Sequence, residues 1–375
     1  MKKNVLVLIA ALWIMPLAAL SEVIEKEFTV VPGKKLDIDL KCGGTLDIHG
    51  WEKNVVAVKA RLDGRDGQDC KVEFSETSSG VQIFAHYEGR KRNYSSSLKF
   101  EIMVPARFDL RMESMGGAIS IDNVNGTIEG KTMGGALNLQ KLQGTLDLTT
   151  MGGGITLKNS DVDGRVKTMG GQVLVEDVRG DIKAATQGGK VIQRNVTRRS
   201  GEAGRGEVSI KTMGGDINVD DAPEGTDVHT MGGSIHIKSA AKFARAKTMG
   251  GDIEIGAIDG GVNATTMGGD VTVTMIGDAK QGERNVELTS MGGDIVLSVP
   301  PDLSMQIDIE LAYTRNSSRD YKITSDFPIK QEETTEWDRE GGTSRKYIYG
   351  TGNVSGGKNR VKIKTVNGNV TLKRG

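Results

Sequence analysis

The sequence predicts an all-β protein that folds as a single-domain β-solenoid with coils of 18 residues. Three observations lead to this prediction: a recurring tetrapeptide of the type Thr-Met-Gly-Gly, its regular spacing, and short stretches of alternating apolar and polar residues between its copies. From Met115 to Met169 the tetrapeptide returns every 18 residues. A repeat this short and strict is typical of a solenoid, in which a stack of coils is stable although no coil is stable alone.

The segment 1–21 has the features of a secretory signal peptide. Two lysines precede an apolar run from Val5 to Met15, and the small-residue pattern Ala19-Leu20-Ser21 follows it. We expect cleavage before Glu22 and a mature chain without a transmembrane segment. An uncleaved membrane anchor is the weaker alternative, because the run is shorter than the ~20 residues needed to span a bilayer. The protein is therefore expected to be exported, either to the periplasm or to the cell surface.

The segment 22–111 precedes the regular repeats and is expected to form N-terminal capping β-coils, because a stack of strands exposes an unpaired edge at its end. It contains the two cysteines of the chain, Cys42 and Cys70. In an oxidising compartment they could form a disulfide, which would stabilise these coils by ~3 kcal/mol. Two unbonded thiols are the alternative.

The segment 112–300 contains the regular repeats, each with two short strands. Alternation predicts that equivalent side chains of successive coils face inward and stack on one another, with coils ~4.8 Å apart. In the second strand we place Ile128 and Val166 at equivalent positions, followed by a column of smaller residues. The paired glycines are expected to form corners, because a tight reversal demands the positive φ that glycine reaches at little cost.

Methionine stands second in nine of ten tetrapeptides, and Gln187 takes its place in the other. We predict that these side chains point outward, because a dry core would penalise the glutamine. They would form a flexible apolar stripe that is large enough to be a partner surface. The alternative is that they fill the end of the core. The methionines are Met115, Met133, Met151, Met169, Met213, Met231, Met249, Met267 and Met291.

Charged residues follow the repeats in two patterns. Lysine stands two residues before the methionine in alternate coils, which we interpret as solvated charge spaced to limit repulsion. A cationic track for an anionic polymer is the alternative, with nearby aspartates such as Asp216 available to neutralise it. Two longer repeats also place basic residues at one edge, and insertions on one face often mark a binding face, although ordinary loop variation is the simpler explanation. These candidate partner residues are Arg198, Arg199, Arg205, Lys280 and Arg284.

The segment 301–375 departs from the repeat and is expected to be a C-terminal β capping region. Its aromatic residues, among them Tyr313 and Trp337, could alternatively form a platform for stacking sugars. The tetrapeptide Thr365-Val366-Asn367-Gly368 is a degenerate copy of the repeated one.

These motifs resemble the bacterial putative adhesin family of exported β-helical proteins, a domain of unknown function related to the head domain of putative autotransporter adhesins. Members repeat Thr-x-x-Gly-Asp-Ile or Thr-x-Gly-Gly-Asp-Ile. The resemblance implies a solenoid at the cell envelope with no known catalytic residues, and it does not supply a ligand. The matching segments are 28–33, 36–38, 46–51, 104–105, 292–300 and 365–370.

Two classes of function fit the sequence. The first is a noncatalytic, adhesin-like envelope or cell-surface protein that presents a repetitive face to a protein, a glycan or a surface, with self-association as a further option. The second is a polysaccharide-degrading β-helix enzyme, which would need clustered carboxylates, commonly with calcium. We favour the first, because the acidic residues are spread singly along the repeats. A formal net charge of zero argues against a nucleic-acid partner, and two cysteines with four histidines offer no ordinary zinc site. No cofactor is expected.

Overall fold

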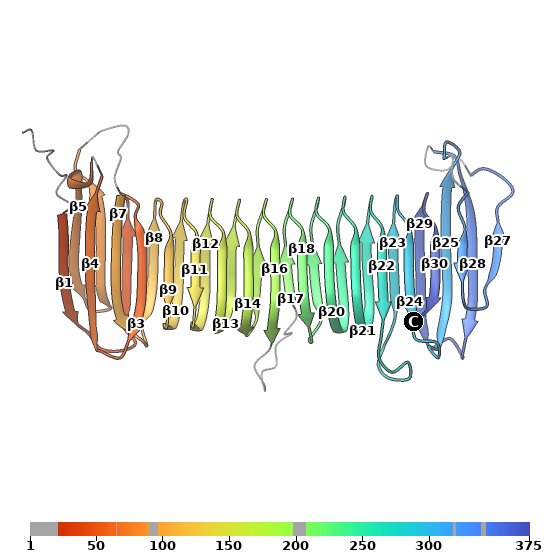
Figure 1. The fold of residues 1–375 in the computed structure, drawn as a ribbon, viewed down its shortest axis with the longest axis horizontal. Helices are drawn as coiled ribbons and strands as arrows, with labels where there is room; N and C mark the ends of the chain where they lie inside the picture. The colour runs from red at the N-terminus through yellow and green to blue at the C-terminus, as the bar shows by residue number, and fades with distance from the viewer. Residues whose placement is uncertain (1–21, 65, 90–96, 198–207, 318–319, 339–342) are drawn as a thin grey trace, which may run out of the picture.

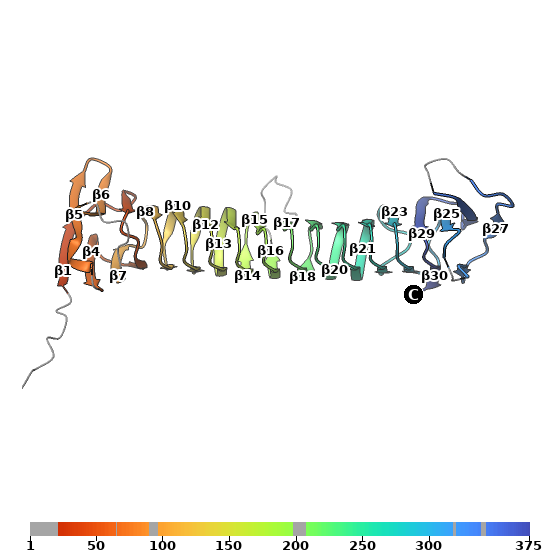
Figure 2. The ribbon, with the colours of Figure 1, turned by 90° about the horizontal axis from the view of Figure 1, so that it is seen from above.

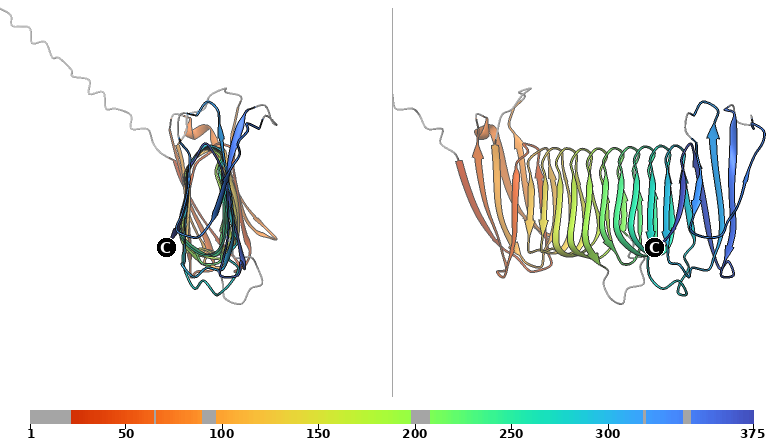
Figure 3. Two further views of the ribbon diagram at one scale, coloured as in Figure 1. Left: turned by 90° about the vertical axis from the view of Figure 1, so that its right-hand side faces the viewer. Right: turned by 45° about the vertical axis from the view of Figure 1, so that its right-hand side comes forward.

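The computed structural model describes residues 22–64, 66–89, 97–197, 208–317, 320–338 and 343–375. In these ranges the protein is all-β, with one short 3-10 helix and no α-helix (Figure 1). The strands stack side by side along the long axis of the molecule. Seen from above and end on, they form two layers that face each other across a thin interior (Figure 2 and Figure 3). Within the described ranges, no helix has the length and apolarity required to cross a bilayer.

The central stack pairs each strand in parallel with the equivalent strand of the next coil. Ile119 is level with Leu137, and Leu137 is level with Ile155, at steps of 18 residues. The strands are β8 (Asp109–Ser114), β9 (Ile119–Asp122), β10 (Asn125–Thr132), β11 (Leu137–Gln140), β12 (Gln143–Thr150), β13 (Ile155–Thr168), β14 (Val173–Arg179), β15 (Ile182–Ala185), β16 (Val191–Thr197), β17 (Val208–Lys211), β18 (Ile217–Ala222), β19 (Thr226–His229), β20 (Ile235–Lys247), β21 (Ile253–Thr266), β22 (Val271–Met275), β23 (Val286–Ser290) and β24 (Ile295–Val299).

The core is a set of buried columns between the two layers. Ile119, Leu137 and Ile155 are each at most 1% exposed and stack in one such column. Our placement of Val166 beside Ile128 is wrong. Val166 is level with Ala184, and Gly164 takes its expected place. A shift of two residues keeps the same side chains inward, so alternation alone does not detect it.

The N-terminal end of the stack is not built in sequence order. β2 lies between β8 and β6, and β3 lies between β9 and β7, so the first coil is enclosed by later strands. The remaining strands of this end pair antiparallel. A disulfide joins Cys42, in the turn after β2, to Cys70 at the start of β5. The elements are β1 (Glu22–Thr29), β2 (Lys35–Leu40), β3 (Thr45–Trp51), β4 (Val55–Asp63), the 3-10 helix η1 (Gly67–Asp69), β5 (Cys70–Thr77), β6 (Gly80–Tyr87) and β7 (Ser97–Pro105).

The C-terminal end repeats this arrangement. β29 lies between β23 and β25, and β30 pairs with β24, so the last strands of the chain continue the central stack. The degenerate tetrapeptide therefore stacks on the previous corner, where Thr365 Oγ1 donates to Gly293 O at 2.7 Å. The strands are β25 (Met305–Thr314), β26 (Ile323–Ser325), β27 (Lys330–Glu333), β28 (Arg345–Val354), β29 (Asn359–Val366) and β30 (Val370–Arg374).

Candidate binding surface

Each Thr-Met-Gly-Gly corner is fixed by its buried threonine. Thr248 is fully buried, and its Oγ1 donates to Gly233 O of the preceding coil at 2.8 Å while accepting from its own Gly251 N–H at 3.3 Å. One hydroxyl thus satisfies two backbone groups, one in each of two successive coils. The same pair of bonds is made by Thr150, Thr168, Thr186, Thr212, Thr230, Thr266 and Ser290.

The second glycine of each corner is required by close packing between coils, which corrects our explanation by positive φ. Among the paired glycines from Gly116 to Gly293, only Gly117 has a positive φ in the left-handed region, at 88°. A Cβ built on Gly233 would instead lie 2.2 Å from Gly215 O. On the first glycine, Gly232, the nearest atom would be 3.7 Å away. The first glycine therefore has room for a side chain and the second does not, although the motif repeats both glycines.

The corner methionines point outward and form one row along an edge of the stack, which we call the methionine ridge. Their side chains range from 38% exposed at Met169 to 57% at Met115, and Met151 is half-buried. Eight of the twelve most exposed large apolar side chains in the described ranges belong to the ridge. The corners themselves form the continuous row of arches along the upper edge in Figure 1. Apolar exposure is thus concentrated on one long edge, and its use as a partner surface stays a prediction.

A lysine row runs beside the ridge on the outer face of one layer. It comprises Lys131, Lys167, Lys211 and Lys247, all exposed, and strand pairing places them at alternate levels of one column. Among the described residues, none of these four ammonium groups takes part in an ion pair. At the end of the same column Lys364 differs, because Glu310 Oε2 lies 2.7 Å from its Nζ and the hydrogen bond raises the pKa of Lys364.

An aspartate row lies on the other side of the ridge in its C-terminal half. Its carboxylates accept hydrogen bonds from the backbone of the next coil. Asp270 N–H donates to Asp252 Oδ1 at 2.9 Å, and Asp294 N–H donates to Asp270 Oδ1 at 2.7 Å. Asp216 accepts from Ser234 N–H in the same way. These carboxylates support the stack and make no ion pair with the lysine row in the described structure, so the neutralisation that we considered does not occur through direct contact.

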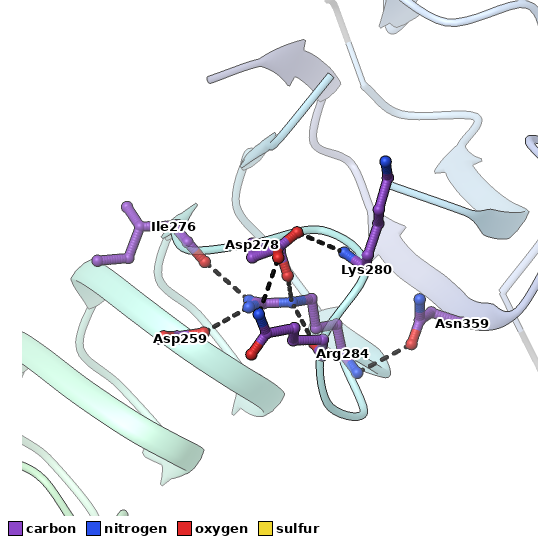
Figure 4. A network of polar contacts seen from close by, with 7 residues as sticks. Asp259, Ile276, Asp278, Lys280, Arg284 and Asn359 are labelled. Atoms are coloured by element: carbon purple, nitrogen blue, oxygen red, sulfur yellow. Dashed lines mark hydrogen bonds and ion pairs between the residues drawn. The ribbon is translucent and has the colours of Figure 1, made fainter. Parts of the chain in front are cut away.

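The opposite edge carries the second insertion, and here one predicted surface residue is buried. Arg284 is 2% exposed, which corrects its assignment to a partner surface. Its guanidinium donates to Ile276 O at 2.7 Å and to Asp278 O and Gln281 O at 3.1 Å, and it pairs with Asp259 (Figure 4). Arg284 therefore holds the turn of the loop together. Lys280 of the same loop is exposed, whereas Arg198, Arg199 and Arg205 lie outside the described residues.

The opposite edge also contains a shallow polar groove of about 420 Å³. It is lined by a column of residues at the second turn of successive coils, and five of them have positive φ between 47° and 59°. They are Asn123, Lys141, Asn159, Asp177 and Asn195. Asparagine and aspartate tolerate this conformation better than most residues, so this column has a conformational explanation.

The aromatic residues of the C-terminal region pack mainly against one another. The rings of Tyr313 and Trp337 meet edge to face with centroids 5.8 Å apart, and those of Tyr347 and Tyr349 stack at 5.8 Å. Tyr313 donates its hydroxyl hydrogen bond to Glu333, which raises the pKa of Tyr313 to about 12. Ring faces used in this way are less available to a sugar. In the described ranges, no cluster of three or more His, Cys, Asp or Glu residues has an arrangement that could hold a metal ion.

Comparison with known proteins finds a family model that matches part of the chain. Residues 205–373 match the family model described as Toastrack DUF4097. Among solved structures, a putative adhesin from Parabacteroides distasonis is 12% identical, with 74% of this chain and 97% of that chain covered and a TM-score of 0.34. A putative cell adhesion protein from Clostridium sporogenes is 11% identical, with 94% and 100% covered and a TM-score of 0.19. No match was found among curated proteins.

Proposed function

We propose that the chain, in which residues 205–373 match the Toastrack DUF4097 family model, is a noncatalytic, adhesin-like protein of the cell envelope or cell surface. In this proposal the segment 1–21 is a cleaved signal peptide, and 112–300 is a β-solenoid with 18-residue coils between caps at 22–111 and 301–375. The rigid stack presents the methionine ridge as a repetitive binding edge.

The observation that carries the proposal is the concentration of exposed methionine on one edge. A soluble monomer rarely exposes a long contiguous apolar feature unless a partner covers it. Methionine also suits such a surface, because its unbranched thioether side chain adapts its shape to what it contacts. The core columns mix valine, isoleucine and leucine, whereas the ridge holds methionine at nine of ten positions, so the residue type as well as its apolarity distinguishes this edge.

A binding assay tests this proposal. Labelled protein is incubated with washed cells and with isolated envelope fractions of the producing organism. We expect saturable binding that is lost when the nine ridge methionines are changed to glutamine, the residue already present at Gln187. Ile276→Gln together with Tyr349→Gln is the matched control, because both are exposed large side chains outside the ridge.

A screen for polysaccharide degradation tests the noncatalytic part. We expect no turnover. Reproducible cleavage that disappears when one acidic residue is replaced would overturn the proposal in favour of an enzyme.

A further inference from the structure

The central part of the methionine ridge combines exposed apolar side chains with positive charge on both of its sides. Met169 and Met213 flank Gln187 there. Lys167 and Lys211 of the lysine row lie on one face of the stack, and neither takes part in an ion pair within the described structure. Lys190 lies on the other face, next to the side-chain amide of Asn218. The ridge is therefore amphipathic at this point, with thioethers at its crest and ammonium groups below.

The two ends of the ridge have a different charge environment. Towards the N-terminus, Lys131 is level with Glu113 on the neighbouring strand. Towards the C-terminus, the side of the ridge that bears Lys190 continues as the aspartate row, which begins at Asp216. In the centre, Asp147 and Asp227 stand in the same register relation to Lys167 and Lys211. Arg165 binds Asp147 through two hydrogen bonds of 2.8 and 2.6 Å, and His229 Nε2 lies 3.4 Å from Asp227 Oδ1. The contact with Arg165 lowers the pKa of Asp147 and compensates its charge.

We propose that the central segment of the ridge, centred on Met151, Met169 and Met213 with Lys167, Lys190 and Lys211, docks on the surface of a lipid bilayer that contains anionic lipids. The proposal deepens the proposed function, on which it rests, by naming the partner of the binding edge. The thioethers enter the boundary between head groups and acyl chains, and the ammonium groups contact lipid phosphates, as in other interfacial amphipathic surfaces.

The shape of the ridge favours a bilayer over other partners. The ridge is one side chain wide, so a rigid protein would contact it along a line and would bury far less than the roughly 800 Å² per partner of a stable interface. The lipids of a fluid bilayer, in contrast, can rearrange around a narrow edge and contact it on both sides. A soluble anionic polymer would contact the lysines and leave the methionines in water. Two copies joined edge to edge with their lysine rows on the same side would bring like charges together, which is unfavourable.

The test is co-sedimentation of the full protein with vesicles of phosphatidylglycerol and phosphatidylcholine, compared with vesicles of phosphatidylcholine alone. We expect binding to the anionic vesicles only. Changing Met151, Met169 and Met213 to glutamine should weaken binding about tenfold through lost apolar contact. The double variant Lys167→Gln with Lys211→Gln should weaken it to a similar extent, about tenfold.

A matched triple variant separates the centre from the rest of the ridge. Met231, Met249 and Met267 occupy the same corner position beside the aspartate row, and their change to glutamine should weaken binding less than about twofold. Circular dichroism checks that each variant keeps its β structure. Equal loss in both triple variants, or no binding of the unaltered protein to anionic vesicles, overturns the proposal. Dependence on the lysines alone, with equal binding to dextran sulfate, would also overturn it and identify a polyanion site.

The outcome also distinguishes failure of this proposal from failure of the proposed function. Protein that binds envelope fractions through the ridge but ignores anionic vesicles has a different envelope partner. Protein that binds neither contradicts both proposals.

Discussion

The two long edges of the stack are built by different rules, although both consist of turns between the same strands. At the methionine edge every corner has the same length, and the second glycine of each lies against the backbone of the previous coil. At the opposite edge the turns vary in length and the loop around Arg284 leaves the stack. Close backbone contact between coils also occurs at the opposite edge, where a Cβ on Gly180 would lie 2.2 Å from Val162 O. The difference between the edges is therefore that the glycine corner recurs at every level, whereas the opposite turns vary and include an insertion.

The largest loss of stability is expected when a methyl group is added to the second glycine of one corner. In Gly233→Ala the new Cβ would lie 2.2 Å from Gly215 O, and neither backbone can move without disturbing the next coil. We expect a loss of about 3 kcal/mol in unfolding free energy, measured by thermal or urea denaturation. Gly232→Ala is the control, because a Cβ at this position would have its nearest neighbouring atom 3.7 Å away. Equal effects of the two changes would show that the corner is not closely packed.

A second change removes the buried hydroxyl and keeps the side-chain shape. Thr248→Val leaves Gly233 O and Gly251 N–H without their partner. We expect a loss of about 2 kcal/mol in the same denaturation experiment. Thr248→Ser should lose much less, because Ser290 makes the same two bonds in another coil. If serine were as damaging as valine, packing rather than hydrogen bonding would explain the threonine.

The opposite edge should respond locally. Arg284→Met removes the guanidinium that holds three carbonyl groups of the loop, but those groups can turn to water because the loop is at the surface. We expect about 1 kcal/mol of lost stability and faster proteolysis between Ile276 and Arg284, followed by mass spectrometry. Lys280→Met changes an exposed position in the same loop, and proteases should cleave this variant no faster than the unaltered protein. Unchanged proteolysis in Arg284→Met would show that the loop does not need this residue.

The smallest effect on stability is expected from the ridge itself. Peroxide should oxidise the exposed ridge methionines while Met112, Met275 and Met305, at most 2% exposed, stay reduced until the protein unfolds. Because the oxidised groups already face water, the unfolding free energy should change by less than about 0.5 kcal/mol. Peptide mass spectrometry gives the order of oxidation. Oxidation of buried and ridge positions at one common rate would contradict the outward orientation.

Repetition explains why much of the architecture could be predicted from the sequence. The alternation in each coil identified Ile119 and its equivalents as core, and Gln187 indicated that the corner position meets water. Both inferences use a pattern repeated in successive coils, so a local exception such as Gly164 did not hide it.

Contacts between coils explain what could not be predicted. The sequence shows that Gly233 is a glycine, but the atom that a Cβ would strike belongs to the previous coil. Arg284 looks like any charged loop residue until the loop folds around it. The interleaving of β29 between β23 and β25 pairs residues separated by long stretches of chain, for which alternation carries no signal.

That interleaving has a consequence for the order in which the chain can fold. A polypeptide that emerges with its N-terminus first can lay down β9 to β24 one level at a time as it appears. The open side of β24 then stays uncovered until β30, which comes much later in the sequence, has been made. A product that ends before β30 therefore leaves the edge of β24 unpaired. An unpaired strand edge is open to pairing with other chains, which leads to aggregation.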